Sequence, residues 1–136
     1  MALSLLDTDI LSEVFKRRNA EVKQHAATYL QQHLQFTFSA FSRFEVRRGY
    51  FSKQATQQLS RFDAFCGHCQ VLPVDDAIFN RAARLWADAR RGGHPCGDAD
   101  VLIAATALEH GLTLVTGNLR HFGWITGLQT QDWRVP

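Results

Sequence analysis

Short apolar runs alternate along the chain with longer stretches in which apolar residues recur at helical spacing. The runs that favour strands are residues 3–6, 36–38, 71–74 and 112–115, with a weaker fifth at 128–130. Strands that alternate with helices in this way are typical of a parallel sheet. The pattern therefore predicts an α/β fold in one domain over residues 1–136, with helices flanking a central, mostly parallel sheet of four to five strands.

Two of the expected helices begin at clear capping residues. Asn19 and Asp75 each precede a stretch of helical period, and both residue types accept hydrogen bonds from first-turn amides. The stripes expected to be buried are Val22, Ala26, Tyr29 and Leu30 in the first helix, and Ile78, Ala82, Leu85, Trp86 and Ala89 in the second. Gly92-Gly93 and Gly111 are expected to end helices.

The composition is that of a soluble globular protein. Hydrophobic residues make up 46% and charged residues 21% of 136 residues, which suits one ordinary domain. Asp7 and Asp9 interrupt the apolar start, which is thus too short and too acidic for a signal peptide or a membrane span. We therefore expect a cytoplasmic protein with no membrane association.

The cysteines form no convincing functional motif. Cys66-Gly67-His68-Cys69 matches a thiol-disulfide signature, but it follows a predicted helix, whereas redox chemistry needs the first thiol at a helix N-terminus. A zinc site that adds His94 and Cys96 would have a spacing unlike that of common zinc fingers. We expect free thiols.

Polar residues stand directly after three of the expected strands. Asp7, Thr8 and Asp9 follow the first, Ser39 follows the second, and Thr116, Gly117 and Asn118 follow the fourth. Ligands of open α/β sheets bind beyond the carboxyl ends of the strands. A functional site is therefore expected at this edge.

Two further carboxylates are expected near that edge. Asp100 begins a very apolar helix on the side that faces the interior, and Glu45 lies at the edge of an inward-facing stripe. Simpler roles remain open at this point. Asp7 or Asp9, and likewise Asp98 or Asp100, could cap helices, while Glu45 could pair with Arg43 or Arg48 on a solvated face.

Carboxylates gathered in this way repel one another unless a divalent cation neutralises them. Ligands that are all oxygen suit Mg²⁺, or Mn²⁺, rather than zinc, and such an ion can activate water against a phosphodiester. The net charge of +2 says little about partners. Three basic clusters could face phosphates or could be solvated helix faces, namely Lys16, Arg17 and Arg18; Arg43, Arg47 and Arg48; and Arg84, Arg90 and Arg91.

Four segments together resemble the PIN domain, and more specifically the VapC toxins of toxin-antitoxin pairs. Leu6-Asp7-Thr8-Asp9 resembles the family's Leu-Asp-Thr-Asn start, and Phe44-Glu45-Val46-Arg47-Arg48-Gly49 is similar to its Glu-Leu-x-x-Gly helix. Asp100-Val101-Leu102-Ile103-Ala104-Ala105 matches Asp-x-x-Ile-Ala-Ala, and Thr116-Gly117-Asn118 resembles the late Thr-x-Asn or Thr-x-Asp motif. The resemblance spans nearly the whole chain.

The resemblance implies a Mg²⁺-dependent endoribonuclease. It does not identify the RNA, for which we expect tRNA or another structured RNA. It assigns the metal ligands to Asp7, Glu45 and Asp100, with Asn118 as a further catalytic residue. Supporting positions around them are Thr8, Ser39, Asp98 and Thr116, of which Asp98 is our own addition. The implied partners are a VapB-type antitoxin and a second copy of the chain in a homodimer.

Three departures from the family pattern bear on these roles. Asp9 stands where Asn or Ser is usual, Asn118 where many members have Asp, and His121 where an acidic residue often precedes the phenylalanine. The competing interpretation is a catalytically weak PIN-like module that binds RNA or protein. Metal dependence of cleavage discriminates between the two.

Overall fold

The computed structural model describes residues 1–136, and its five strands form one sheet in which all neighbours are parallel. The order across the sheet is β3-β2-β1-β4-β5. The strands are β1 (Ser4–Leu6), β2 (Thr37–Ser39), β3 (Gln70–Leu72), β4 (Thr113–Val115) and β5 (Thr130–Gln131). The predicted α/β fold with a parallel sheet is confirmed, including the weak fifth strand.

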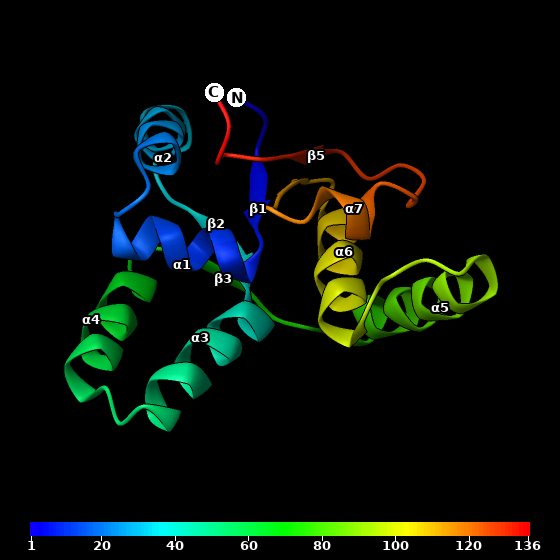
Figure 1. The fold of residues 1–136 in the computed structure, drawn as a ribbon, viewed down its shortest axis with the longest axis horizontal. Helices are drawn as coiled ribbons and strands as arrows, with labels where there is room; N and C mark the ends of the chain where they lie inside the picture. Colours follow the sequence, from blue (N-terminus) through cyan, green and yellow to red (C-terminus); the bar gives the residue numbers. More distant parts are fainter.

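Seven helices connect and cover the strands, as Figure 1 shows. They are α1 (Thr8–Lys16), α2 (Ala20–His33), α3 (Ala40–Ser52), α4 (Thr56–Cys66), α5 (Asp76–Gly92), α6 (Asp98–His110) and α7 (Leu119–Phe122). In Figure 1 the α3–α4 pair lies below α1 on one side of β1, and the α5–α6 pair lies on the other side, while α3 also contacts α6. No helix is both long enough and apolar enough to cross a membrane.

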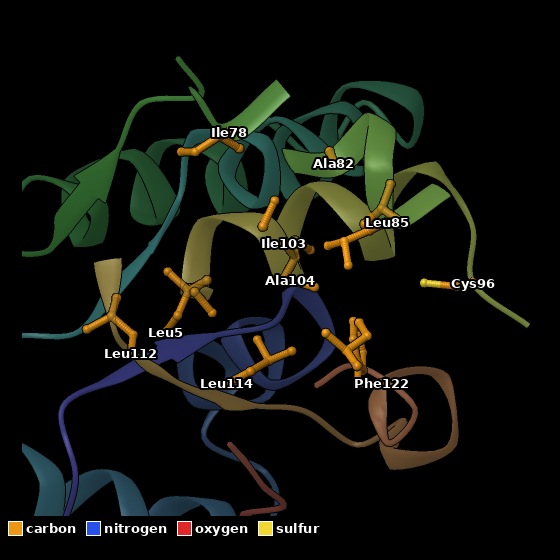
Figure 2. Packing of buried hydrophobic residues seen from close by; sticks show 14 of the residues in the cluster. Leu5, Ile78, Ala82, Leu85, Cys96, Ile103, Ala104, Leu112, Leu114 and Phe122 are labelled. Carbon is orange, nitrogen blue, oxygen red and sulfur yellow. The ribbon is translucent and has the colours of Figure 1, made fainter. Parts of the chain in front are cut away.

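The central strand β1 separates two hydrophobic cores because successive side chains of a strand point to opposite faces. Leu5 packs into a mostly aliphatic core with residues of α5, α6 and β4 and with Phe122 of α7, which Figure 2 shows around Leu114 and Ile103. Leu6 packs into a second core, rich in aromatic rings, with residues of α1, α2 and α4. Each side chain is essentially buried, so β1 is anchored on both faces.

The predicted helix caps are confirmed. The side chains of Asn19 and Asp75 accept bonds from the backbone N–H of Val22 and Ile78, both at 3.0 Å. Gly93 and Gly111 end α5 and α6 at positive φ of 67° and 64°, a backbone conformation that glycine adopts without the steric cost of a Cβ.

Two members of the predicted buried stripes are in fact exposed. Leu30 is 38% exposed and Trp86 is 41% exposed, whereas the other stripe residues are buried. Trp86 lies on the outer side of α5, where the Arg90 guanidinium covers its ring at 4.4 Å from the centroid. A large apolar side chain next to a buried position can therefore be covered by a neighbouring cation instead of by the core.

The three cysteines are free. Cys66 ends α4, so the Cys66–Cys69 motif stands at a helix C-terminus as the sequence predicts. Burial raises the pKa of the Cys66 thiol to about 11 and that of Cys69 to about 12, which is the opposite of thiol activation.

Candidate active site

Asp7 follows β1 at the carboxyl edge of the sheet. The register pairs Leu6 with Val115, so that Asp7 and Thr116 lie side by side as the chain leaves the two strands. The Thr116 hydroxyl donates to Asp7 Oδ2 at 2.8 Å, and the Thr8 backbone N–H donates to Oδ1 at 2.8 Å. Asp7 is therefore both the cap of α1 and a fixed carboxylate of the site.

The surroundings of Asp7 disfavour the ionised form of its carboxyl group, so its pKa is raised. Burial raises its pKa most, and the nearby Asp9 and Asp100 carboxylates add to the rise, while the bonds from Thr116 and Thr8 oppose it. The resulting pKa is about 6. No ion pair offsets this charge. A cation bound beside Asp7 would favour the ionised form.

Glu45 comes to the site from α3. The Thr8 hydroxyl donates to Glu45 Oε1 at 2.6 Å, which links the start of α1 to the middle of α3. The other oxygen, Oε2, accepts from the Arg48 guanidinium at 3.4 Å. The ion pair between Glu45 and Arg48 that the sequence left open is therefore present. The shorter bond is the one from Thr8, and it holds the Glu45 carboxylate beside Thr8, the residue that follows Asp7.

Asp100 lies in the first turn of α6. Its Oδ2 accepts from the backbone N–H of Gly97 at 3.2 Å and lies 3.0 Å from the Nδ1 of His121. The residue at the N-cap position is Gly97, and Asp100 caps α6 from the first turn by accepting from the Gly97 N–H, so the capping role that the sequence left open for Asp100 is present. His121, which departs from the family pattern, instead pairs with the third carboxylate.

These residues line one open cleft, called here the acidic cleft. It contains Asp7, Thr8, Asp9, Ser12, Lys16, Glu45, Val46, Gly49, Tyr50, Lys53, Ala99, Asp100, Ile103 and Asn118. All four predicted catalytic positions are thus brought together. The Asn118 side chain makes no capping bond to α7, and its backbone N–H donates to the Thr116 hydroxyl at 3.0 Å.

Three predicted supporting residues lie outside the lining of the acidic cleft. Thr116 is fully buried and acts on Asp7 from behind, and Ser39 is buried and caps α3 through the Phe41 N–H at 3.0 Å. Asp98 is exposed and does not line the cleft, so its expected place beside the ligands is wrong. Helix periodicity explains this, since a residue two positions from Asp100 points about 200° away around α6.

The donor set suits a hard divalent cation. Carboxylate oxygens dominate the cleft, and the amide oxygen of Asn118 adds a neutral ligand. No three acidic, histidine or cysteine side chains are already gathered as a finished metal site. Asp7, Glu45 and Asp100 are the side chains that would hold such an ion, and Asp100 is paired here with His121.

The sequence places Asp9 at the expected functional edge without a specific role, and the structure shows that Asp9 lines the cleft and is held there by a distant residue. Its Oδ1 accepts from the Ile10 N–H at 2.8 Å, and its Oδ2 accepts from Arg134 at 3.3 Å. Arg134 also pairs with Glu13 at 3.1 Å. Both Asp9 oxygens are therefore engaged by the protein, and no local signal links positions 9 and 134.

The contact between Arg134 and Asp9 also leaves no room for a side chain at position 117, which is glycine. A Cβ added to Gly117 would lie 2.1 Å from an Arg134 guanidinium nitrogen and 2.9 Å from Asp9 Oδ2. The absent side chain leaves room for the guanidinium to lie beside the turn that carries Asn118. This glycine in the late motif is therefore explained by a packing contact.

The match to known families agrees with this geometry. Residues 4–123 match the model of the PIN domain. The chain belongs to the PIN-domain family. It is 30% identical over 132 residues to ribonuclease VapC1 of Haemophilus influenzae (strain R2866), with 95% of this chain and 96% of that protein covered. It is 29% identical over 130 residues to the tRNA(fMet)-specific endonuclease VapC of Shigella flexneri, with the same two coverages.

A solved structure supports the same placement. This PIN domain is similar to a chain of the DNA-bound VapBC complex from Salmonella typhimurium, with a TM-score of 0.83 and 26% identity over 98% of this chain and 99% of that one. The relatives place this PIN domain in the VapC branch, and it is a nuclease of that type.

Proposed function

We propose that the protein is a Mg²⁺-dependent endoribonuclease, the toxin of a toxin-antitoxin pair, which hydrolyses phosphodiesters of tRNA or another structured RNA. The observation that carries the proposal is the Asp7 carboxylate, which is buried beside Asp9 and Asp100 with no basic side chain paired to it and has a pKa of about 6. Carboxyl groups in a cleft with a strongly raised pKa are typical of functional sites. Relatives named ribonuclease and tRNA(fMet)-specific endonuclease support the RNA substrate.

Asp7, Glu45 and Asp100 would hold Mg²⁺, or Mn²⁺, with the Asn118 amide as a neutral ligand or a contact to the attacking water. The bound ion would lower the pKa of a water and stabilise the leaving oxygen. The chain's own part is positioning. Thr116 holds the buried oxygen of Asp7, and Thr8 holds Glu45, so two ligands are oriented through hydroxyl groups before any ion binds.

Two partners follow from the proposal. The solved relative from Salmonella typhimurium is a VapBC complex, which supports a cognate VapB-type antitoxin for this chain. A homodimer remains a prediction, and large apolar side chains that are exposed offer surface for either contact, namely Phe44, Phe51, Phe79 and Trp86. With this substrate and partner, we propose that the protein acts in the cytoplasm.

The test is cleavage of a pool of total tRNA and other structured RNA by purified, antitoxin-free protein, with Mg²⁺ or with EDTA. The matched pair of variants is Asp100→Asn and Asp98→Asn, because both residues lie in the first turn of α6 and only Asp100 lines the acidic cleft. We expect cleavage by the native protein and by Asp98→Asn in Mg²⁺ only, and none by Asp100→Asn.

Two outcomes would contradict the proposal. Cleavage that persists in EDTA, or that Asp100→Asn retains in full, would exclude these residues as metal ligands. Complete absence of cleavage, with RNA binding retained, would favour the alternative of a catalytically weak module that binds RNA or protein.

A further inference from the structure

A second hollow adjoins the acidic cleft and carries the opposite charge. This cationic hollow is lined by Phe15, Lys16, Arg18, Tyr50, Lys53, Ala55, Gln58 and Arg61. Three of its residues, Lys16, Tyr50 and Lys53, also line the acidic cleft. The two hollows are therefore parts of one groove, which runs from the carboxylates past two lysines to two arginines.

The charge of the cationic hollow is not neutralised within the protein. Its lining contains no acidic residue, and its four cations take part in no ion pair. All four side chains are exposed to solvent, so they remain available to an anion. A concave surface lined by one sign of charge concentrates counter-ions of the other sign.

Most arginines of the other two basic clusters are engaged within the protein, and neither Arg43 nor Arg84 lines the groove. Arg47 bonds to Asp63 at 3.0 Å, and Arg48 bonds to Glu45 and covers the ring of Phe44. On the outer side of α5, Arg91 pairs with Asp88, and Arg90 covers Trp86. Of the three clusters that the sequence offered, only the one at the end of α1 supplies free cations to a hollow next to the carboxylates.

The wall of the hollow also has a fixed aromatic element. The Tyr50 ring packs against Phe15 and Phe62, with centroids 6.4 Å and 6.3 Å away, so its position is set by the aromatic core. Lysine and arginine donate hydrogen bonds without accepting them, which suits phosphate oxygens. Arginine and tyrosine also offer flat surfaces on which a base of a single strand can stack.

We propose that the cationic hollow is a subsite for the backbone phosphates of the RNA strand next to the phosphodiester that is cleaved. Lys16 and Lys53 contact the phosphate nearest the acidic cleft, and Arg18 and Arg61 contact the next one along the groove. The proposal rests on the proposed function, since it takes RNA as the substrate. It adds a direction, because the strand leaves the carboxylates over α1 and α4 and not over α5.

The test is equilibrium binding of a fluorescent single-stranded RNA to the native protein and two double variants in EDTA, where metal-dependent cleavage cannot occur. Lys53→Gln with Arg61→Gln removes two charges from the hollow. Arg84→Gln with Arg91→Gln removes two exposed charges from α5 and is the matched control. The affinity is measured over a series of salt concentrations, and thermal unfolding verifies that each variant is folded.

We expect the hollow variant to bind RNA about tenfold more weakly at low salt, with a salt dependence shallower by roughly one to two in the slope of log K against log salt. The α5 variant should stay within about twofold of the native protein. Equal losses in the two variants would overturn the subsite, and so would unchanged RNA affinity of the hollow variant together with a loss of antitoxin binding.

The outcome also separates this inference from the proposed function. If the native protein cleaves RNA with Mg²⁺ and the hollow variant binds RNA normally, the subsite is wrong and the nuclease assignment stands. If the native protein neither binds nor cleaves RNA, both are wrong.

Discussion

The two ends of the groove are built in opposite ways. At the acidic end, both oxygens of the buried Asp7 accept hydrogen bonds, and Glu45 is held by Thr8. At the cationic end, the charged groups of Lys53 and Arg61 are exposed and unpaired. The difference indicates that the acidic end depends on position, while the cationic end depends on charge. Substitutions should therefore act in an all-or-none manner at one end and in a graded manner at the other.

The largest effect is expected for Asp7→Asn. The amide keeps the shape of the side chain but removes the charge that would hold the metal, so cleavage should fall at least about a thousandfold, since metal chemistry contributes several kcal/mol and each 1.36 kcal/mol is tenfold. Single-turnover cleavage of saturating RNA measures this loss. Lys53→Gln with Arg61→Gln should keep the same single-turnover rate at saturation. A large loss of that rate in the cationic variant would contradict the division between the two ends.

The same aspartate predicts a pH dependence of stability in the metal-free protein. The pKa of Asp7 is about 6 in the folded protein and 3.8 ordinarily, so the folded state binds this proton more tightly than the unfolded state does. The free energy of unfolding should therefore fall by about 2 kcal/mol as the pH rises from about 4 to about 6.

Urea unfolding in EDTA at several pH values measures that fall. Asp7→Asn lacks the titrating group, so above pH 6 it should be more stable than the native protein by a similar amount. Added Mg²⁺ should stabilise the native protein at pH 7 and leave the variant unchanged. If the free energy of unfolding changed with pH in the same way in the two proteins, Asp7 would not have a raised pKa.

A smaller effect, on stability, is expected for Gly117→Ala, next to the contact between Arg134 and Asp9. Gly117→Ala places a Cβ against the Arg134 guanidinium, which must move away from Asp9 and Glu13. Loss of these half-buried pairs should cost roughly 1 kcal/mol of stability. The measurement is a double-mutant cycle with Arg134→Gln, in which the alanine should cost less once the guanidinium is absent. Additive losses would show that Gly117 does not act through Arg134.

The smallest effect is expected for Arg48→Gln. Arg48 is a largely exposed partner of Glu45 at 3.4 Å, so the pair contributes little, and the cleavage rate should change less than about twofold. Thr8→Val, which removes the 2.6 Å bond to the same carboxylate, should reduce the rate by about tenfold, in line with the loss of a group that orients a metal ligand. If Arg48→Gln reduced the cleavage rate more than Thr8→Val does, Arg48 and not Thr8 would be the residue that positions Glu45.

The sequence predicts those features that depend on neighbouring residues or on a repeated pattern. Asn19, Asp75 and Gly111 are recognisable from local capping chemistry, and Asp7 is recognisable because it follows a buried strand. The resemblance to the PIN domain selects Asp100 over Asp98, and the cleft contains Asp100 alone of the two. Local pattern and family motif therefore give the fold and the main carboxylates.

The features that sequence reasoning missed depend on contacts between distant residues. Arg134 meets Asp9 across 125 positions, and His121 meets Asp100 across 21. The exposure of Trp86 could not be predicted from the period of its helix. The period indicates which side of the helix faces the core, but it does not indicate how far around the helix the core extends. Lys53 and Arg61 belong to no basic run, and only the packing of α3 against α4 brings them to one hollow.

The place of β1 at the centre of the sheet has a consequence for synthesis of the chain. Asp7 is synthesised more than 100 residues before the groups that fix it from the β4 side, namely the Val115 carbonyl, which accepts from the Asp7 N–H at 2.8 Å, and the Thr116 hydroxyl. Contacts of such long sequence separation also form slowly. An unfinished chain that ends before β4 therefore carries Asp7 without the Thr116 hydroxyl that holds its Oδ2, and the proposed metal site can form only after β4 and Thr116 have been made.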